Sequence, residues 1–212
     1  MLKLVKTGSR TGAQSERRRD DLRALAEGAC RGQPRAVRTF VTAIGPAVLR
    51  VVRRMIGPTH PDVEDLTQEA TLHVLEALPR YRGECSVLHF VCRIAVLAAM
   101  NARRQYGAEK RTGLEYADVE LDGVPAPEPN PEALAATRRA MERVRELLAT
   151  LPEPQAEALA LHCVLGYTVT EIARSTGVPA ETVRSRLRLA GRSLRPRLVG
   201  EGTQRERIEG AS

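Results

Sequence analysis

The amino-acid sequence predicts an all-α protein, built as two small helical domains joined by a flexible linker, with a helix-turn-helix in the second. Apolar residues recur at helical spacing along most of the chain and nowhere alternate with polar residues. Residues 107–130 lose this periodicity and are rich in proline, glycine and acids, which is typical of an interdomain linker. Residues 168–194 contain the cap and turn residues of two short helices that meet at a tight turn.

Composition limits the kind of partner before any motif does. The 212-residue chain contains 33 Lys and Arg against 26 Asp and Glu, a formal net charge of +7. This balance favours an acidic polymer as partner, although charge alone does not separate nucleic acid from an anionic membrane. The N-terminal segment has no apolar stretch suited to a signal peptide, and no later run is long enough to span a bilayer. We therefore expect a cytoplasmic protein without a membrane partner.

The pattern divides the chain into five segments. These are a disordered N-terminus (1–15), a first helical domain (16–106), the linker (107–130), a second helical domain (131–198) and a frayed tail (199–212). In the first domain, Gly45-Pro46 is expected to kink or divide a long helical stretch that ends at Gly57-Pro58.

The helix expected over residues 62–78 has an acidic face with an apolar centre. Asp62 is placed to cap its first turn, where acidic charge also meets the positive end of the helix dipole. Opposite the core stripe lie Asp65, Gln68 and Glu69 around Leu72. In so basic a chain this face is typical of a protein-docking surface, with an ordinary solvated face as the alternative.

The helix expected over residues 86–105 follows a connector in which Gly83 permits a tight bend. Its outer face combines arginines with Val96 and Met100, which are predicted to be exposed, while Asn101 falls in the core stripe. Single-stranded DNA needs cations for its phosphates and apolar contacts for its base faces, so this surface favours a melted strand. The arginines of the face are Arg93, Arg103 and Arg104.

The helix-turn-helix is expected between Thr168 and Leu194. Thr168 and Glu171 have capping-box spacing, and Gly177 suits the left-handed residue that ends a helix. The apolar seam of the next helix consists of Val183, Leu187, Ala190 and Leu194. Its other face suits a DNA major groove, a solvated basic helix being the alternative. The residues on or beside that face with DNA-contacting side chains are Thr182, Arg184, Ser185, Arg188 and Arg192.

The four cysteines are few and scattered, as expected in a reducing compartment. Cys85, His89 and Cys92 are spaced i, i+4 and i+7, which could place three zinc ligands on one helix face. No fourth ligand is evident nearby, so a zinc hydrolase is the weakest hypothesis. We expect no metal, no cofactor and no catalytic residue.

Two stretches resemble the extracytoplasmic-function (ECF) sigma factors of bacterial RNA polymerase, in the sigma-70 superfamily. HPDVEDLTQEATLHVLEALPRYRGECSVLHFVCRIA is similar to the N-terminal sigma domain of the family, with its acid-rich DLTQE helix and YRG loop. LPEPQAEALALHCVLGYTVTEIARSTGVPAETVRSRLRLAGRSLRPRL is similar to the C-terminal sigma domain, including the TVRSRL recognition-helix core. Two motifs in the order of the family are far more specific than a lone helix-turn-helix.

The resemblance implies a specificity subunit that binds core polymerase, directs it to promoters and assists their opening, and therefore no enzyme. The acidic face would dock on the clamp coiled coil of the β′ subunit. The residues expected to meet the minus-ten promoter element and its melted strand are Arg82, Arg93, Asn101, Arg103 and Arg104. For the minus-thirty-five element, the resemblance adds Arg186 to the residues of the recognition helix. Family members are often held by an anti-sigma factor clamped between the two sigma domains, although no residue here identifies one.

Two positions depart from the family pattern. Phe90 stands where the family usually has Trp, and Leu97 stands where it tends to have Asn. Stacking of a base on an aromatic ring contributes on the order of 1 to 3 kcal/mol, so both changes bear on promoter melting. The alternative function is a helix-turn-helix regulator that binds DNA without acting as a polymerase subunit.

Overall fold

The computed structural model describes residues 10–109 and 141–209, and side chains within 20–105 and 141–196. The helices are α1 (Arg10–Cys30), α2 (Pro34–Ile56), α3 (Val63–Ala77), α4 (Val87–Glu109), α6 (Glu153–Leu159), α7 (Val169–Thr176) and α8 (Ala180–Glu209), with the short helical segments η1 (Leu78–Arg80) and η3 (Ala160–Val164). Residues 141–149 are also helical. Within the described ranges every regular element is a helix, which confirms the predicted class.

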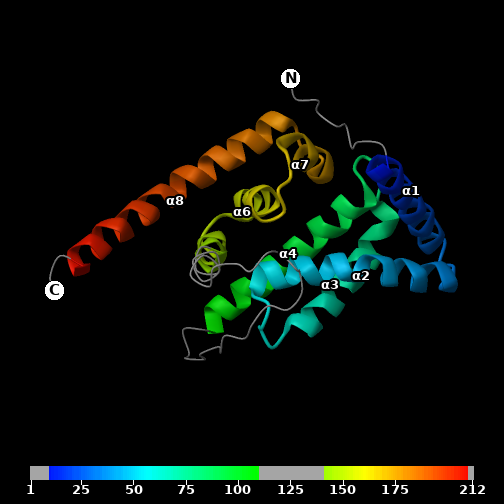
Figure 1. Ribbon diagram of the computed structural model, residues 1–212, viewed down its shortest axis with the longest axis horizontal. Coiled ribbons are helices and arrows are strands. Elements are labelled where there is room, and N and C mark those ends of the chain that lie inside the picture. Colours follow the sequence, from blue (N-terminus) through cyan, green and yellow to red (C-terminus); the bar gives the residue numbers. More distant parts are fainter. Residues whose placement is uncertain (1–9, 110–140, 210–212) are drawn as a thin grey trace, which may run out of the picture.

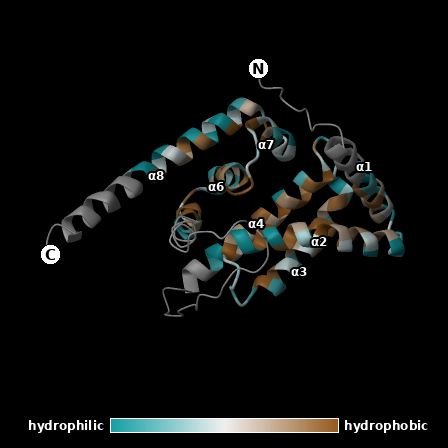
Figure 2. Cartoon of the chain, viewed as in Figure 1, coloured by the Kyte–Doolittle hydropathy of each residue, from teal (hydrophilic) through white to brown (hydrophobic). Residues whose placement is uncertain are grey.

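The front half, residues 10–109, is a bundle in which α2, α3 and α4 all pack against one another. Figure 1 shows α1 lying across one end of this bundle, where it packs mainly on α2. Apolar residues gather along α2, α3 and α4, as Figure 2 shows. Phe40, Ile44 and Val91 are fully buried at its centre. Burial of each such side chain contributes roughly 1.5 to 3 kcal/mol, so this stripe accounts for much of the stability of the half.

Helix α2 continues through Pro46 without dividing. Proline lacks the N–H that would bond the carbonyl of Thr42, but Thr42 and Pro46 are both exposed, so water can satisfy that carbonyl. The expected end of the helix is confirmed, because α2 stops at Ile56 and Gly57 has a φ of 109°. Few residues other than glycine adopt such a φ.

The cap predicted at Asp62 is wrong. Its side chain makes no capping hydrogen bond, and its backbone, at φ −88° and ψ 13°, lacks the extended conformation that an N-cap side chain needs. The backbone N–H of Asp62 donates instead to Nδ1 of His60 at 3.3 Å. The acids of the first turn, Glu64 and Asp65, are present as expected and face the positive end of the α3 dipole.

Three helices extend beyond their predicted limits, and one of them is α4, which ends at Glu109 instead of near residue 105. Helix α1 begins at Arg10, inside the segment whose composition predicts disorder, and α8 continues to Glu209, through most of the predicted tail. Adding a residue to an existing helix is far easier than nucleating one, so a helix can extend past its apolar face. The linker from residue 110 onward and the start of the second domain, up to residue 140, lie outside the described residues.

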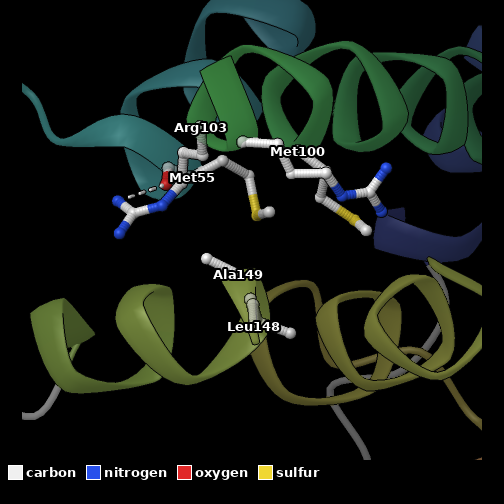
Figure 3. A pocket seen from close by; sticks show the side chains of 6 residues that line it. Met55, Met100, Arg103, Leu148 and Ala149 are labelled. Atoms are coloured by element: carbon white, nitrogen blue, oxygen red, sulfur yellow. Dashed lines mark hydrogen bonds between the residues drawn. The ribbon is translucent and has the colours of Figure 1, made fainter. Parts of the chain in front are cut away.

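The C-terminal half, residues 141–209, covers part of the front half. Its buried residues join those of the front half in one contiguous core cluster, and α4 contacts both η3 and α7. Figure 1 shows α6 and α7 above α4, while α8 extends away from the rest of the molecule. A small pocket at this junction has Met55 and Met100 facing Leu148 and Ala149 in Figure 3.

Candidate nucleic-acid and protein interfaces

The acidic face of α3 is open to solvent. Asp65, Gln68 and Glu69 are exposed, and Leu72 among them is 59% exposed, the largest value for a large apolar side chain in the described structure. On the opposite side of α3, Leu66 and other apolar residues are buried against the bundle. The predicted exposure of this face is confirmed. An apolar side chain surrounded by acids is a suitable contact for a basic protein surface.

The loop from Tyr81 to Ser86 leads into α4 and is held at both ends. The Tyr81 hydroxyl donates to the carbonyl of Cys85, and Gly83 has a φ of 77°, which confirms the expected bend. The Ser86 hydroxyl accepts from the backbone N–H of His89 at 3.1 Å and so caps α4. Arg82 is exposed in this loop.

Phe90, at the position where a tryptophan is usual in the family, is half-buried and belongs to the bundle. Its ring centroid lies 5.0 Å from that of Tyr81, at an interplanar angle of 47°. Leu97, the other departure, is also only half-exposed. Phe90 therefore helps to fix the loop against α4 through a tilted aromatic contact.

The outer face of α4 differs from the prediction in what it exposes. Val96 is 0% and Met100 5% exposed, so the prediction that both lie open is wrong. Asn101, expected in the core stripe, is exposed. The physical reason is that α4 is covered on two sides, by α2 and α3 and by the C-terminal half. Helical periodicity predicts one buried apolar face of a helix, but it does not show that a distant segment also buries a second face.

The arginines of this face form ion pairs with carboxylates of the C-terminal half. The Arg93 guanidinium lies 2.7 Å from Glu157, that of Arg104 3.1 Å from Glu153, and that of Arg103 3.7 Å from Glu142. Burial lowers the pKa of Arg103 below its usual value. Arg104 also donates to Oδ1 of Asn101 at 3.2 Å.

Two further arginines connect the halves through main-chain carbonyls. Arg145 is 8% exposed and donates to the carbonyls of Arg54, at 2.8 Å, and Arg53, at 3.5 Å, in the last turn of α2. In return, Arg54 donates to the carbonyl of Val164, at the end of η3, at 3.2 Å. Each arginine thus satisfies carbonyls at the negative end of a helix of the other half.

Tyr167 packs on α4 at the other end of the junction. Its ring centroid lies 4.3 Å from that of His89, and its hydroxyl lies beside the buried Cys92 thiol. Burial raises the pKa of Tyr167 far above its usual value and also raises the pKa of Cys92. Both groups are therefore neutral at physiological pH.

Sequence reasoning missed the acids and the arginine that make these contacts, namely Glu142, Glu153, Glu157 and Arg145. Each occupies a helix on which a charged residue would ordinarily be solvated, so local pattern gives no signal. Such a residue is identified only by the burial of its charge in the folded chain. Glu157, for example, is 6% exposed, and this burial depends on the tertiary fold.

The helix-turn-helix has the predicted local geometry. The Thr168 hydroxyl accepts from the N–H of Glu171 at 3.2 Å, and the Glu171 carboxylate accepts from the N–H of Thr168 at 2.8 Å, which confirms the capping box. The backbone N–H and the hydroxyl of Thr168 both donate to the Glu171 carboxylate, and these two hydrogen bonds lower its pKa. Gly177 ends α7 in the left-handed region at φ 71°.

On α8 three of the four residues of the predicted seam are buried and the fourth, Leu187, is half-buried, while most of the opposite face is exposed. Val183 and Ala190 are 0% exposed, and Leu194 is 7%. The exposed arginines of that face, or beside it, are Arg184, Arg188 and Arg192, and the half-exposed residues are Thr182, Ser185 and Arg186. Local contacts already orient two of them, since Arg184 pairs with Glu181 at 3.0 Å and Arg188 donates to Ser185 at 3.2 Å.

The structure gives no support to the zinc alternative. Within the part of the chain that it describes, no three His, Cys, Asp or Glu residues are grouped so as to hold a metal ion. The Cys92 thiol contacts Tyr167, and the pKa of Cys85 is raised by burial.

Two family models match the chain in the order that the sequence predicts. Sigma-70 region 2 matches residues 40–109, and Sigma-70 region 4 matches residues 141–194. The first range ends with α4, and the second contains the helix-turn-helix. Fold and matches together define a sigma factor of the sigma-70 type.

The relatives define the group within that class. The chain is 30% identical over 185 residues to the ECF RNA polymerase sigma factor SigD of Mycobacterium tuberculosis, an alignment that covers 85% of each chain. It is 29% identical over 167 residues to the ECF RNA polymerase sigma-E factor of Escherichia coli K12, covering 77% of this chain and 86% of the other. The chain therefore belongs to the ECF RNA polymerase sigma factors. It is a transcription initiation factor that directs RNA polymerase to promoters.

A solved structure has the same fold. CnrH, determined in complex with the cytosolic domain of CnrY, matches with a TM-score of 0.50 and 21% identity, covering 84% of this chain and 97% of that chain. Along residues 10–109 and 141–209, no helix combines the length and apolar character needed to cross a membrane.

Proposed function

We propose that the acidic face of α3 is the surface that docks on core polymerase, at the clamp coiled coil of the β′ subunit. The observation that carries this proposal is Leu72, which is 59% exposed at the centre of exposed Asp65, Gln68 and Glu69 in a chain of net charge +7. Negative charge steers the encounter with a basic partner, and an apolar centre supplies area to bury.

The α4 face and the loop before it bind the minus-ten element in this proposal. Arg82 and Asn101 are exposed, while Arg93, Arg103 and Arg104 lie on the same helix with their guanidinium groups paired to acids. Guanidinium groups suit phosphates because both can form two parallel hydrogen bonds. The half-buried Phe90 holds the loop in place rather than offering a fully open ring to a flipped base.

Helix α8 recognises the minus-thirty-five element in the major groove. Its buried seam fixes the helix on α7, so that Arg184, Arg188 and Arg192 face solvent together. Arginine can form two hydrogen bonds to a guanine, and hydroxyl groups such as those of Thr182 and Ser185 contact the phosphate backbone.

An anti-sigma factor is the proposed regulator. CnrH was solved in complex with the cytosolic domain of CnrY, and this chain shares the CnrH fold at 21% identity. Co-purification from the native cell tests the idea, because core polymerase and any inhibitor would appear together.

Reconstituted run-off transcription tests the whole assignment. Purified chain added to cognate core polymerase should yield specific transcripts from genomic fragments, and the polymerase alone should yield none. A chain that footprints DNA without polymerase and never changes its transcripts would instead be a helix-turn-helix regulator, which family membership does not favour. Elemental analysis of the same sample checks for metal.

A further inference from the structure

One face of α2 consists of arginines and short side chains. The helix contains five arginines and no acid along its 23 residues. At 3.6 residues per turn, four of these arginines point within about 60° of one direction, and all four are exposed. They form the arginine face of α2, which consists of Arg35, Arg38, Arg50 and Arg53. The opposite side of α2 is buried in the bundle formed with α1, α3 and α4.

The arginine face is not neutralised by the parts of the chain that the structure describes. Among residues 20–105 and 141–196, no carboxylate forms an ion pair with any of its four arginines. Other arginines are satisfied within the molecule, since Arg93 pairs with Glu157 and Arg145 donates to main-chain carbonyls. A solvated protein surface ordinarily mixes charges of both signs, whereas a row of cations without acids attracts an anionic partner.

The arginine face is long, and its middle is low. Its end residues, Arg35 and Arg53, are 18 positions apart, which corresponds to about 27 Å along a helix. The exposed side chains between the two pairs of arginines are all short, namely Thr39, Thr42, Ala43 and Pro46. Both threonine hydroxyls donate to main-chain carbonyls of α2, so the guanidinium groups are the free donors of the face. A straight anionic rod could therefore lie along it in contact with both pairs of arginines.

The chemistry of the face selects among anionic partners. Single-stranded nucleic acid needs aromatic or apolar side chains for its bases, and a helix that binds a membrane surface needs large apolar residues to insert. The exposed large apolar side chains of the described structure lie on α3, α4 and α8, and not on α2. Duplex DNA turns its bases inward and carries about one phosphate per 1.7 Å of its axis, so it offers regular charge without requiring an apolar contact.

We propose that the arginine face of α2 is a third DNA-binding surface, which binds the phosphate backbone of duplex DNA and does not read its sequence. It goes beyond the surfaces proposed on α4 and α8, because it shares no residue with either. It also extends outside the match to Sigma-70 region 2, which begins at residue 40, after Arg35 and Arg38. The inference rests on the role of the chain at promoters and not on the minus-ten or minus-thirty-five assignment.

The salt dependence of duplex binding tests the proposal. The probe is a fluorescein-labelled random-sequence duplex of about 30 base pairs, followed by anisotropy over a range of salt concentrations. The full chain with Arg35→Gln and Arg53→Gln should bind roughly tenfold more weakly at about 0.1 M salt. The slope of log affinity against log salt should fall by about 2, because two phosphate contacts are lost while those of α8 remain.

Two controls separate contact at this face from a change in net charge. Arg35→Lys with Arg53→Lys keeps both charges and should retain most of the wild-type slope, because a lysine also contacts a phosphate. Arg23→Gln with Arg80→Gln removes two charges from exposed positions outside the face and should change affinity by less than about twofold. An unchanged slope in the Arg35/Arg53 glutamine variant would overturn the proposal, as would an equal loss in the Arg23/Arg80 control.

Other partners give different results. If the Arg35/Arg53 glutamine variant bound duplex DNA normally but lost affinity for phosphatidylserine vesicles, the face would be a membrane contact and the proposal would be wrong. The same holds if only its affinity for core polymerase fell. Circular dichroism checks the fold, and the single variant Arg35→Gln, in the first turn of α2, must still lower the slope by about 1.

Run-off transcription distinguishes failure of this proposal from failure of the proposed function. Unchanged duplex binding by the Arg35/Arg53 glutamine variant together with normal transcripts would remove the third surface and leave the sigma activity intact. Absence of specific transcripts from wild type and variants alike would count against the function itself.

Discussion

Helices α3 and α4 pack side by side in the front half, yet their charged faces differ in access. The acids of α3 surround an exposed Leu72, while Arg93 and Arg104 of α4 pair with the glutamates of α6. The acidic face of α3 is thus open to solvent, while part of the cationic face of α4 is paired with acids of the C-terminal half. The comparison teaches that a charge pattern indicates what a face can bind, whereas access to that face depends on residues far away in the sequence.

The largest effect is expected from a substitution that unfolds the C-terminal half, residues 141–209, which covers part of α4. Val183 is 0% exposed on α8, and Val183→Asp would bury an unpaired carboxylate. We expect a loss of about 3 to 5 kcal/mol in the free energy of unfolding, with loss of helicity in the C-terminal half. Urea titration followed by circular dichroism measures it.

Leu189→Asp on the same helix is the matched control for that change. Leu189 is 43% exposed, so its carboxylate would remain hydrated and cost little. Equal destabilisation by both substitutions would contradict the described seam of α8.

Reversing charge on the open face should have the next largest effect. Asp65→Lys with Glu69→Lys leaves the buried side of α3 unchanged, so the fold should persist. We expect the affinity for core polymerase to fall by about 3 kcal/mol, roughly a hundredfold, because like charges would meet at the interface. Core-binding titration measures this, with Asp20→Lys plus Glu27→Lys on α1 as control. An equal loss in the control would indicate a nonspecific charge effect.

The cationic face of α8 is exposed to solvent, whereas the arginines of α4 are paired with acids, so a substitution on α8 tests an accessible cationic face. Arg188→Ala should weaken promoter binding by roughly 1 to 3 kcal/mol, with the loss concentrated at one base pair if the guanidinium contacts a base. Gel shifts over single-base promoter variants measure the pattern. A uniform loss across all variants would assign Arg188 to a phosphate, and no loss at all would remove it from the interface.

The smallest effect is expected at the N-terminal cap of α7, the helix that lies between η3 and α8 in the chain. Thr168→Ala removes the capping box and should cost about 1 kcal/mol in unfolding free energy, while Thr168→Ser should retain most of it. Urea unfolding at about pH 7 measures the difference. Identical midpoints for Ala and Ser would mean that the cap contributes nothing.

The same cap has a pH dependence of defined sign. Hydrogen bonds from Thr168 lower the pKa of Glu171 below its ordinary 4.5. The stabilisation is therefore fully present above pH 4.5 and is lost as the pH falls toward the lowered pKa, where the folded carboxylate takes up its proton. The gap between wild type and Thr168→Ala should narrow on acidification, and a gap that widens would contradict the assignment.

Local rules predicted the local structure of this chain well. The capping box at Thr168, the left-handed Gly177, the α8 seam and the exposed acids around Leu72 each depend on residues within a turn or two, and all agree with the structure. Some errors are local too, such as the cap predicted at Asp62 and the limits of α1 and α8, but the errors at the candidate site arise where distant segments meet. Met100 faces Leu148 and Ala149 of the C-terminal half, and such a covering by a distant segment could not be inferred from periodicity.

The contact roles of the site residues remain predictions, but their placement can be compared with expectation. Arg82, Asn101 and three of the α8 arginines, Arg184, Arg188 and Arg192, are exposed, as contact with DNA requires, while Arg186 is half-exposed. Arg93 was placed correctly on the outer face of α4, and what the sequence lacked was its partner. Ion pairs between residues 64 positions apart leave no local signature, because either charge alone resembles a solvated one.

Tyr167 gives the protein a built-in optical reporter. The chain contains four tyrosines and no tryptophan, so its ultraviolet emission comes from phenol rings alone. The ring of Tyr167 lies 4.3 Å from that of His89, on the other half of the molecule. Parting of the two halves would expose this ring to water and change its emission, and stopped-flow fluorimetry could follow that movement in real time without an attached dye.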